Sequence, residues 1–305
     1  MKRPLAKATL LIKKELGAGF DMVKIVVASG KGGVGKSMLA ASLAILFSKD
    51  KKVVACDCDV DAPNMGLWLG VESHDKSEKI STSKKAEIDQ TKCTHCGKCR
   101  EICRFSAIEL KESEFEVNPF LCEGCGACEI VCPVDAIELK EVKNGELRFK
   151  QTQYGFTLVS GQLYPGEAGS GKIVEELRKR AESLDHDYII MDAAAGIGCP
   201  VIASVRGTDF AVLITEPTPS GFSDLKRILE IVNHFNVPYG IVINKWDIYK
   251  QTSDEIERWA GNKFLGKISY DKKVIDSIVN LQPVLFSESK TVDEIKDIFQ
   301  RLMKH

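Results

Sequence analysis

Between a short apolar, β-branched run (Val23–Ser29) and an apolar segment with helical spacing (residues 37–49) stands the sequence Gly30-Lys31-Gly32-Gly33-Val34-Gly35-Lys36-Ser37. It fits the pattern G-x-x-x-x-G-K-[ST] in the strand–loop–helix context that this pattern requires. Glycines let successive backbone amides turn toward phosphate oxygens, and the helix N-terminus adds positive dipole. The stretch therefore predicts a nucleotide triphosphate site that extends to Met38, in which Lys36 neutralises the β and γ phosphates and Ser37 ligates magnesium.

Strand-like and helical segments alternate along the remaining chain. Strands are expected at 53–56, 156–159, 188–191, 211–214 and 241–243, with helices such as 173–184 and 225–234 between them. Alternation of this kind is typical of parallel strands joined by right-handed crossovers. The fold class expected is α/β, a three-layer, mainly parallel sheet.

A cysteine-rich block interrupts the alternation. Residues 22–83 and 151–305 are expected to form the two parts of the P-loop domain, and residues 84–150 a small α+β insertion. The stretch 73–90, rich in serine, lysine and glutamate, is expected to be a solvated linker into that insertion.

The phosphate loop carries a second lysine, Lys31. The run Lys-Gly-Gly-Val-Gly-Lys-Ser resembles the deviant Walker A motif of the MinD and ParA ATPases and of the nitrogenase iron protein, and the resemblance covers the sheet domain throughout. In that family the extra lysine reaches the phosphates bound by the partner subunit. The resemblance thus implies an ATP-dependent homodimer with Lys31 and Lys36 in catalysis; the alternative is that Lys31 is an ordinary exposed lysine.

Two further segments resemble the switches of that family. Asp57-Cys-Asp59-Val-Asp61 follows a buried strand, and its carboxylates can hold a magnesium water shell or orient a water. By the match to switch I, Asp59 positions the hydrolytic water and Asp57 supports the metal, although either can be a turn carboxylate. By the match to switch II, Asp192 reaches magnesium through water and the Gly196 amide lies near the γ-phosphate. The proline usual between these two positions is absent.

The segment Asn244-Lys245-Trp246-Asp247 stands at a strand end and fits the N-K-x-D base-recognition motif of GTPases. In that interpretation Asp247 accepts the N1 and N2 hydrogens of guanine, whereas in the MinD-like family an asparagine at this place reads adenine. Because the Lys31 loop resembles ATPases more closely, ATP is favoured and GTP stays open.

A second glycine-rich run, Gly166-Glu-Ala-Gly-Ser-Gly171-Lys172, almost repeats the phosphate-loop pattern. Ile173 replaces the hydroxyl that would hold magnesium, so we expect no second nucleotide site. The run is instead expected to begin a helix close to the first site or to the dimer partner.

Eight of the eleven cysteines belong to two copies of one pattern, C-x-x-C-x-x-C-x-x-x-C, offset by 29 positions. Structural zinc usually takes two CxxC pairs separated by a longer stretch, so a third cysteine this close disfavours zinc. The pair of patterns resembles the bacterial two-cluster ferredoxin, in which the fourth cysteine of each copy binds the other cluster. The resemblance implies two [4Fe-4S] clusters, one on Cys93, Cys96, Cys99 and Cys132 and the other on Cys122, Cys125, Cys128 and Cys103.

Cys56, Cys58 and Cys199 lie outside both patterns. All three are expected to be packing residues. Cys199 also follows Asp192 by seven positions, as does a cluster-binding cysteine of the nitrogenase iron protein, so a dimer-bridging cluster is the alternative there.

Composition narrows the class of protein. The net charge is -1, which gives no global field for nucleic acid, and no apolar run approaches the ~18 residues that span a bilayer. The cysteine block and the lack of a signal-peptide core favour a reducing cytoplasm. Residues 1–21 are expected to be a frayed or non-native extension, or else a short capping helix. Residues 291–305 are expected to form a final helix on the sheet, with a membrane-targeting tail as the alternative.

The function expected is slow ATP hydrolysis, which switches a homodimer and controls electron transfer through two clusters to an unknown redox partner protein. Two other classes stay open: an iron–sulfur assembly carrier, and a positioning or partitioning ATPase that uses the clusters as a redox sensor.

Overall fold

The computed structural model describes residues 23–304, so the expected N-terminal extension (1–21) lies outside the described residues. A nine-stranded sheet runs through the larger part of the chain in the order β13-β12-β11-β1-β10-β2-β9-β8-β3. Its strands are β1 (Val23–Ser29), β2 (Val53–Asp57), β3 (Lys76–Ile80), β8 (Gly145–Gln151), β9 (Thr157–Leu163), β10 (Tyr188–Ala195), β11 (Phe210–Thr215), β12 (Tyr239–Asn244) and β13 (Phe264–Ile268).

The strands from β13 to β9 are parallel to their neighbours, whereas β8 is antiparallel to both β9 and β3. The mainly parallel α/β sheet is therefore confirmed. Central strands such as β2 are buried along their whole length, as expected for a sheet covered on both faces.

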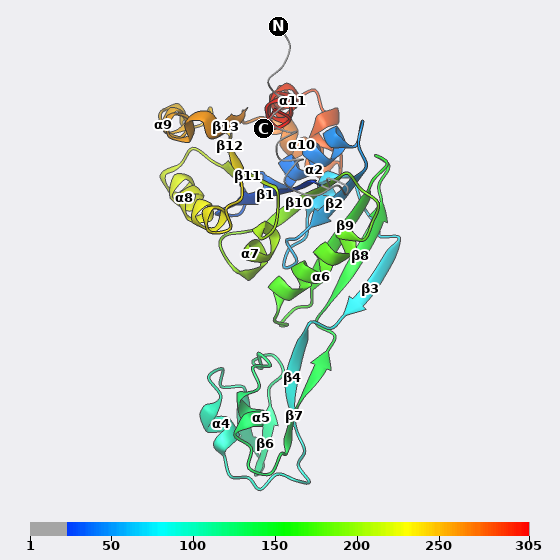
Figure 1. Ribbon diagram of the computed structural model, residues 1–305, viewed down its shortest axis with the longest axis vertical. Coiled ribbons are helices and arrows are strands. Elements are labelled where there is room, and N and C mark those ends of the chain that lie inside the picture. The colour runs from blue at the N-terminus through cyan, green and yellow to red at the C-terminus, as the bar shows by residue number, and fades with distance from the viewer. Residues whose placement is uncertain (1–22, 305) are drawn as a thin grey trace, which may run out of the picture.

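Helices cover the two faces of the sheet and make three layers (Figure 1). One apolar core joins the sheet to α6 (Ser170–Glu182), α7 (Cys199–Val205), α8 (Pro219–His234) and α9 (Lys250–Ala260). The core of the opposite face joins it to α2 (Lys36–Phe47), α3 (Met65–Trp68), α10 (Lys272–Val279) and α11 (Thr291–Leu302). Every residue of α2 is buried, because the helix lies between the sheet and α11.

The expected final helix is confirmed, since Ile295, Ile298 and Leu302 of α11 are buried against the sheet. The longest helix among residues 23–304 is α8, with 16 residues. None of the helices in that range has the length and apolarity of a bilayer-spanning segment.

Residues 83–142 form a separate cysteine lobe outside the nine-stranded sheet (Figure 1). Its elements are β4 (Ser83–Ile88) paired with β7 (Ile137–Val142), β5 (Ile108–Lys111) paired with β6 (Glu114–Val117), and the short helices α4 (Lys98–Ile102) and α5 (Ala127–Ile130). It has its own core, which includes Cys99, Phe115 and Cys128. The antiparallel pair β4 and β7 connects the lobe to the sheet.

The expected solvated linker at 73–90 is wrong, because it contains β3 and β4. Serine, lysine and glutamate are not typical strand residues, so the composition of this segment gave no sign of the two strands. The backbone of β3 is paired by β8 and that of β4 by β7. In addition, β8 (Gly145–Gln151), which fell in the expected insertion, belongs to the nine-stranded sheet.

Candidate functional site

The phosphate loop connects the end of β1 to the start of α2 at the carboxyl edge of the parallel sheet, which is where open α/β sheets bind ligands. Gly35 has φ +89°, and a Cβ there would stand 2.4 Å from Asn244 Nδ2. The same Nδ2 donates to the Val34 carbonyl over 2.9 Å. Glycine at position 35 thus permits a left-handed turn of the backbone. Asn244, the last residue of β12, stabilises this turn by its hydrogen bond to Val34.

Lys36 lies among carboxylates at the ends of two neighbouring strands. Its Nζ is 2.6 Å from Asp192 Oδ1 on β10 and 3.8 Å from Asp59 Oδ2 after β2. Burial acts to lower the pKa of Lys36, but the charges of Asp192, Asp59 and Asp57 outweigh it and raise that pKa. The ammonium therefore stays charged in this buried position.

Asp57 is buried beside Asp192 and accepts the backbone N–H groups of Met65 (2.9 Å) and Asp59 (3.2 Å). Burial, followed by the charge of Asp192, raises the pKa of Asp57 to about 8. Burial also raises the pKa of the Asp59 carboxyl. Three carboxyl groups thus share one ammonium, and this crowding of negative charge in a buried place favours the protonated form of Asp57.

The fully buried Oδ2 of Asp192 has no hydrogen-bond partner within the described residues. An orphaned carboxylate oxygen in an acidic cluster, in contact with the helix start that carries Ser37 through the Lys36 ion pair, fits a divalent cation. Among residues 23–304 no three His, Cys, Asp or Glu side chains converge closely enough to hold a metal ion directly. The set therefore fits magnesium that keeps part of its water shell, which is that ion's usual behaviour.

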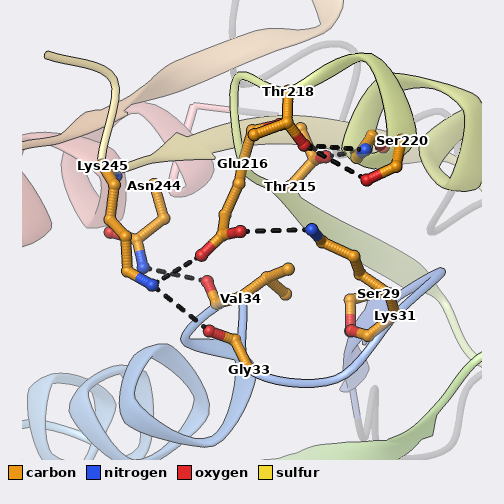
Figure 2. Close-up of polar contacts among 11 residues, drawn as sticks. Ser29, Lys31, Gly33, Val34, Thr215, Glu216, Thr218, Ser220, Asn244 and Lys245 are labelled. Carbon is orange, nitrogen blue, oxygen red and sulfur yellow. Dashed lines mark hydrogen bonds and ion pairs between the residues drawn. The ribbon is translucent and has the colours of Figure 1, made fainter. Parts of the chain in front are cut away.

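Lys31 and Lys245 meet at one carboxylate that sequence reasoning missed (Figure 2). Glu216, directly after β11, has its Oε2 3.2 Å from Lys31 Nζ and its Oε1 2.5 Å from Lys245 Nζ. Lys245 Nζ also lies 3.5 Å from the Gly33 carbonyl oxygen. The only sequence signal for Glu216 was its place just after an expected strand, 211–214.

Of the other residues predicted to bind nucleotide, some lie at the phosphate loop and others have contacts elsewhere. Asn244 lies against the phosphate loop and Met38 is buried within α2. Asp247 contacts other groups, because its Oδ1 accepts the Tyr270 N–H over 2.7 Å and its Oδ2 stands 3.5 Å from Lys290 Nζ. The Gly196 amide, which was expected near the γ-phosphate, donates to the Ser29 carbonyl over 3.0 Å.

Two cavities, one slightly larger than the other, lie in the cysteine lobe. Each is lined by three cysteines of one pattern and the fourth cysteine of the other. The larger is lined by Cys103, Cys122, Cys125 and Cys128, and the smaller by Cys93, Cys96, Cys99 and Cys132. The fold thus brings the fourth cysteine of each copy to the cavity lined by the other copy.

Backbone amides point at three of these sulfur atoms. The N–H groups of Ala107 and Ala136 donate to Cys103 Sγ (3.3 Å) and Cys132 Sγ (3.2 Å), four residues earlier in each copy. The Ala86 N–H of β4 donates to Cys122 Sγ over 3.5 Å. Such bonds stabilise a thiolate, which is the form that binds metal.

The glycine-rich run 166–171 leads into α6, so its prediction as a helix start is confirmed. A Cβ at Gly171 would lie 3.2 Å from the Cβ of Cys199, the first residue of α7. Cys56 and Cys58 are buried, as expected of packing residues, but the same expectation for Cys199 is wrong because its side chain is exposed. The helix start places it at the surface.

Comparison with known proteins supports the nucleotide-binding part of the structure. The profile of the CobQ/CobB/MinD/ParA nucleotide binding domain matches residues 25–284. An uncharacterized protein of Methanocaldococcus jannaschii is 40% identical, over 92% of this chain and 96% of its own length. An iron-sulfur cluster carrier protein of the same organism is 24% identical over 92% of this chain and 84% of its own.

Solved structures agree on the fold. The septum site-determining protein MinD from Pyrococcus horikoshii, complexed with Mg-ADP, superposes with a TM-score of 0.58 at 17% identity, over 93% of this chain and 99% of that one. With the phosphate loop, the buried lysine and the strand-end aspartates in place, the chain belongs to the CobQ/CobB/MinD/ParA family of nucleotide-binding proteins.

Proposed function

We propose that this protein is an ATP-binding and slowly ATP-hydrolysing iron–sulfur protein, in which a nucleotide-dependent homodimer switch controls electron transfer through two [4Fe-4S] clusters. In this proposal the cysteine lobe is an inserted two-cluster ferredoxin domain, drawn from the segment 84–150. The observation that carries it is the pairing of cysteines across the two patterns, which lines each cavity with four thiols.

The nucleotide half of the proposal rests on the acidic cluster at Lys36. Lys36 and Lys31 stabilise the negative charge that develops on the γ-phosphate, while Asp59 orients the attacking water. Magnesium would be held by Ser37 and, through water, by Asp57 and Asp192, and would neutralise the phosphates. ATP is preferred to GTP because both oxygens of the Asp247 carboxylate already have partners, Oδ1 in the Tyr270 N–H and Oδ2 in the Lys290 ammonium 3.5 Å away. The MinD relative complexed with Mg-ADP supports an adenine nucleotide.

The redox half rests on the lobe. When bound, each cluster would supply one-electron chemistry. The cysteines would act as thiolate ligands, and the buried apolar residues around them, such as Phe115 and Ile137, would keep water away. Exposed apolar side chains of the lobe, including Phe105 beside the larger cavity, are available to a redox partner protein.

A second candidate function is favoured by one relative, the iron-sulfur cluster carrier protein of M. jannaschii. A carrier holds its cluster labile and hands it to an apo-protein. Four cysteines around each cavity favour retention of the cluster by this chain. A cluster with a complete set of thiolate ligands has no iron left open for the ligands of a recipient protein.

The test is anaerobic purification of the full chain, followed by iron and sulfide analysis and low-temperature electron paramagnetic resonance of the reduced protein. We expect two [4Fe-4S] signals, ATP binding, and a change in the rate of electron delivery to a dye acceptor when ATP is added. Zinc or empty thiols in oxygen-free material would refute the redox half. Transfer of iron to an apo-ferredoxin, with no effect of ATP on electron delivery, would favour the carrier.

A further inference from the structure

Glu216 is the shared anion of two lysines beside the phosphate loop (Figure 2). The Glu216 side chain is 16% exposed, whereas those of Lys31 and Lys245 are 30% and 32% exposed. Burial alone would raise the pKa of Glu216, but hydrogen bonds and charges from Lys245 and Lys31 lower it below its ordinary value. The carboxylate is therefore ionised near neutral pH, and it faces a loop built for anions.

The backbone that carries Glu216 is rigid. Thr215 Oγ1 donates to the Gly221 carbonyl over 2.9 Å, and Thr218 caps α8 by accepting the Gly221 N–H over 3.0 Å. Prolines on both sides of Thr218, Pro217 and Pro219, restrict the chain further. The lysines, by contrast, reach the carboxylate on long flexible stems. Stems of this length let the two lysines change partners without a change in the backbone that carries Glu216.

We propose that Glu216 is a latch that stands in for a phosphate group and holds Lys31 on its own chain until nucleotide arrives. The inference rests on the proposed function, in which nucleotide drives formation of a homodimer and Lys31 stabilises the negative charge on the γ-phosphate. Carboxylate and phosphate oxygens both accept charge-assisted hydrogen bonds from an ammonium, so Lys31 exchanges one anion for another. The latch therefore sets the nucleotide concentration at which the dimer forms, because its contacts must break first.

The first test uses the full cluster-loaded chain and a non-hydrolysable ATP analogue, with dimer formation measured by sedimentation velocity. The Glu216→Gln variant keeps the size of the side chain and removes its charge. We expect its half-maximal analogue concentration to fall by about fivefold, the effect of one partly exposed ion pair. Glu216→Asp, which keeps the charge, should move the threshold back toward wild type. The matched control is Glu230→Gln, an exposed glutamate of α8.

The second test needs no dimer. An amine-acylating reagent is applied to the nucleotide-free chain, and the labelling rate of each lysine is read by mass spectrometry, with exposed Lys84 as the internal reference. We expect Glu216→Gln to label about fivefold faster at Lys31, again the effect of one partly exposed ion pair, and the Glu230→Gln control to match wild type.

An unchanged labelling rate at Lys31 overturns the latch, as does an unchanged or higher threshold for dimer formation in Glu216→Gln. A chain that never dimerises with nucleotide refutes the dimer switch of the proposed function instead. In that case faster labelling at Lys31 in Glu216→Gln still supports Glu216 as the group that holds this lysine.

Discussion

Lys85 of β4 and Glu167 of the glycine-rich run before α6 form an ion pair with 2.7 Å between Nζ and Oε2, and their side chains are only 9% and 20% exposed. The pair joins the cysteine lobe to the sheet domain. Asn144 reinforces the junction, because its Nδ2 donates to the Ala168 carbonyl over 2.8 Å while its Oδ1 accepts the Thr82 N–H over 2.8 Å. Lys85 directly precedes Ala86, whose N–H donates to Cys122 Sγ of the larger cavity, so the ion pair lies next to a cysteine of that cavity.

The first prediction concerns this ion pair. Glu167→Gln should lower the free energy of unfolding by about 1–3 kcal/mol, because it leaves the more buried member, Lys85, without its charged partner. Lys85→Met should cost less, since Glu167 can turn toward water. Urea unfolding measures both. Lys84→Met, an exposed change on the same strand, is the control, and an equal loss in that variant would contradict the prediction.

The second prediction separates crossed from local cysteine sets. Cys132→Ser should remove the same spectroscopic signal as Cys93→Ser, and Cys103→Ser the same signal as Cys122→Ser, because those pairs line the same cavities. Each variant should lose about half of the bound iron, which falls from two clusters to one. Iron analysis and electron paramagnetic resonance of anaerobic protein are the measurements.

Cys199→Ser is the matched control for the cysteine series, because Cys199 is exposed on α7 and lies outside the lobe. It should retain wild-type iron and spectrum. Loss of the same signal in Cys132→Ser and Cys122→Ser, with that signal retained and the other one lost in Cys93→Ser, would show that the ligand sets are not the crossed ones.

The third prediction concerns pH in protein free of nucleotide and divalent metal. The pKa of Asp57 is raised to about 8 in the folded chain, so the folded chain holds a proton that the unfolded chain releases near pH 4. The contribution of Asp57 to stability is therefore complete below about pH 4 and is lost as the pH rises toward 8.

Asp57→Asn should flatten this part of the pH profile, because an amide does not titrate. The variant should also be less stable at low pH, since the new amide loses one of the two backbone N–H bonds that the carboxyl accepts. Thermal unfolding between pH 5 and 8 measures the slope. Asp61→Asn, an exposed change in the same loop, should keep the wild-type slope, and an unchanged slope in Asp57→Asn would rule out the assignment.

The fourth prediction ranks three alanine substitutions in the phosphate loop. Gly32→Ala meets no atom closer than 3.9 Å, Gly33→Ala is strained by φ +78° but meets nothing within 4 Å, and Gly35→Ala combines φ +89° with a 2.4 Å approach to Asn244. A left-handed non-glycine residue costs roughly 1–2 kcal/mol, and displacing Asn244 adds to that cost. Unfolding of the nucleotide-free protein should show that the loss in free energy of unfolding is smallest for Gly32→Ala, larger for Gly33→Ala and largest for Gly35→Ala. The reverse order would contradict it.

Much of this protein was predictable from local pattern. The bounds of β1 agree with the apolar run before the phosphate loop, and α2 begins within that loop's final residues. The recurrence of one cysteine pattern 29 positions later was enough to indicate a duplicated unit. Periodicity, glycine conformation and short ligand spacing are properties of neighbouring residues, so they can be recognised without knowledge of the fold.

Polar edge strands were beyond that kind of reasoning. Strands β3 and β4 carry mostly lysine, serine and glutamate, and their backbones are paired by strands far along the chain. Short elements such as α7 and β13 were also not predicted, because their few residues hold too little periodic signal.

By itself, the sequence determined that a phosphate loop, a parallel sheet and a duplicated cysteine unit share this chain, since each is written in residues that lie close together. Only the tertiary structure decided the partners of the charged groups. Lys36 and Asp192 are 156 positions apart, and Glu216 meets Lys31 because β11 lies beside β1. An ammonium donates to any carboxylate within reach, so its partner depends on strand order and not on spacing.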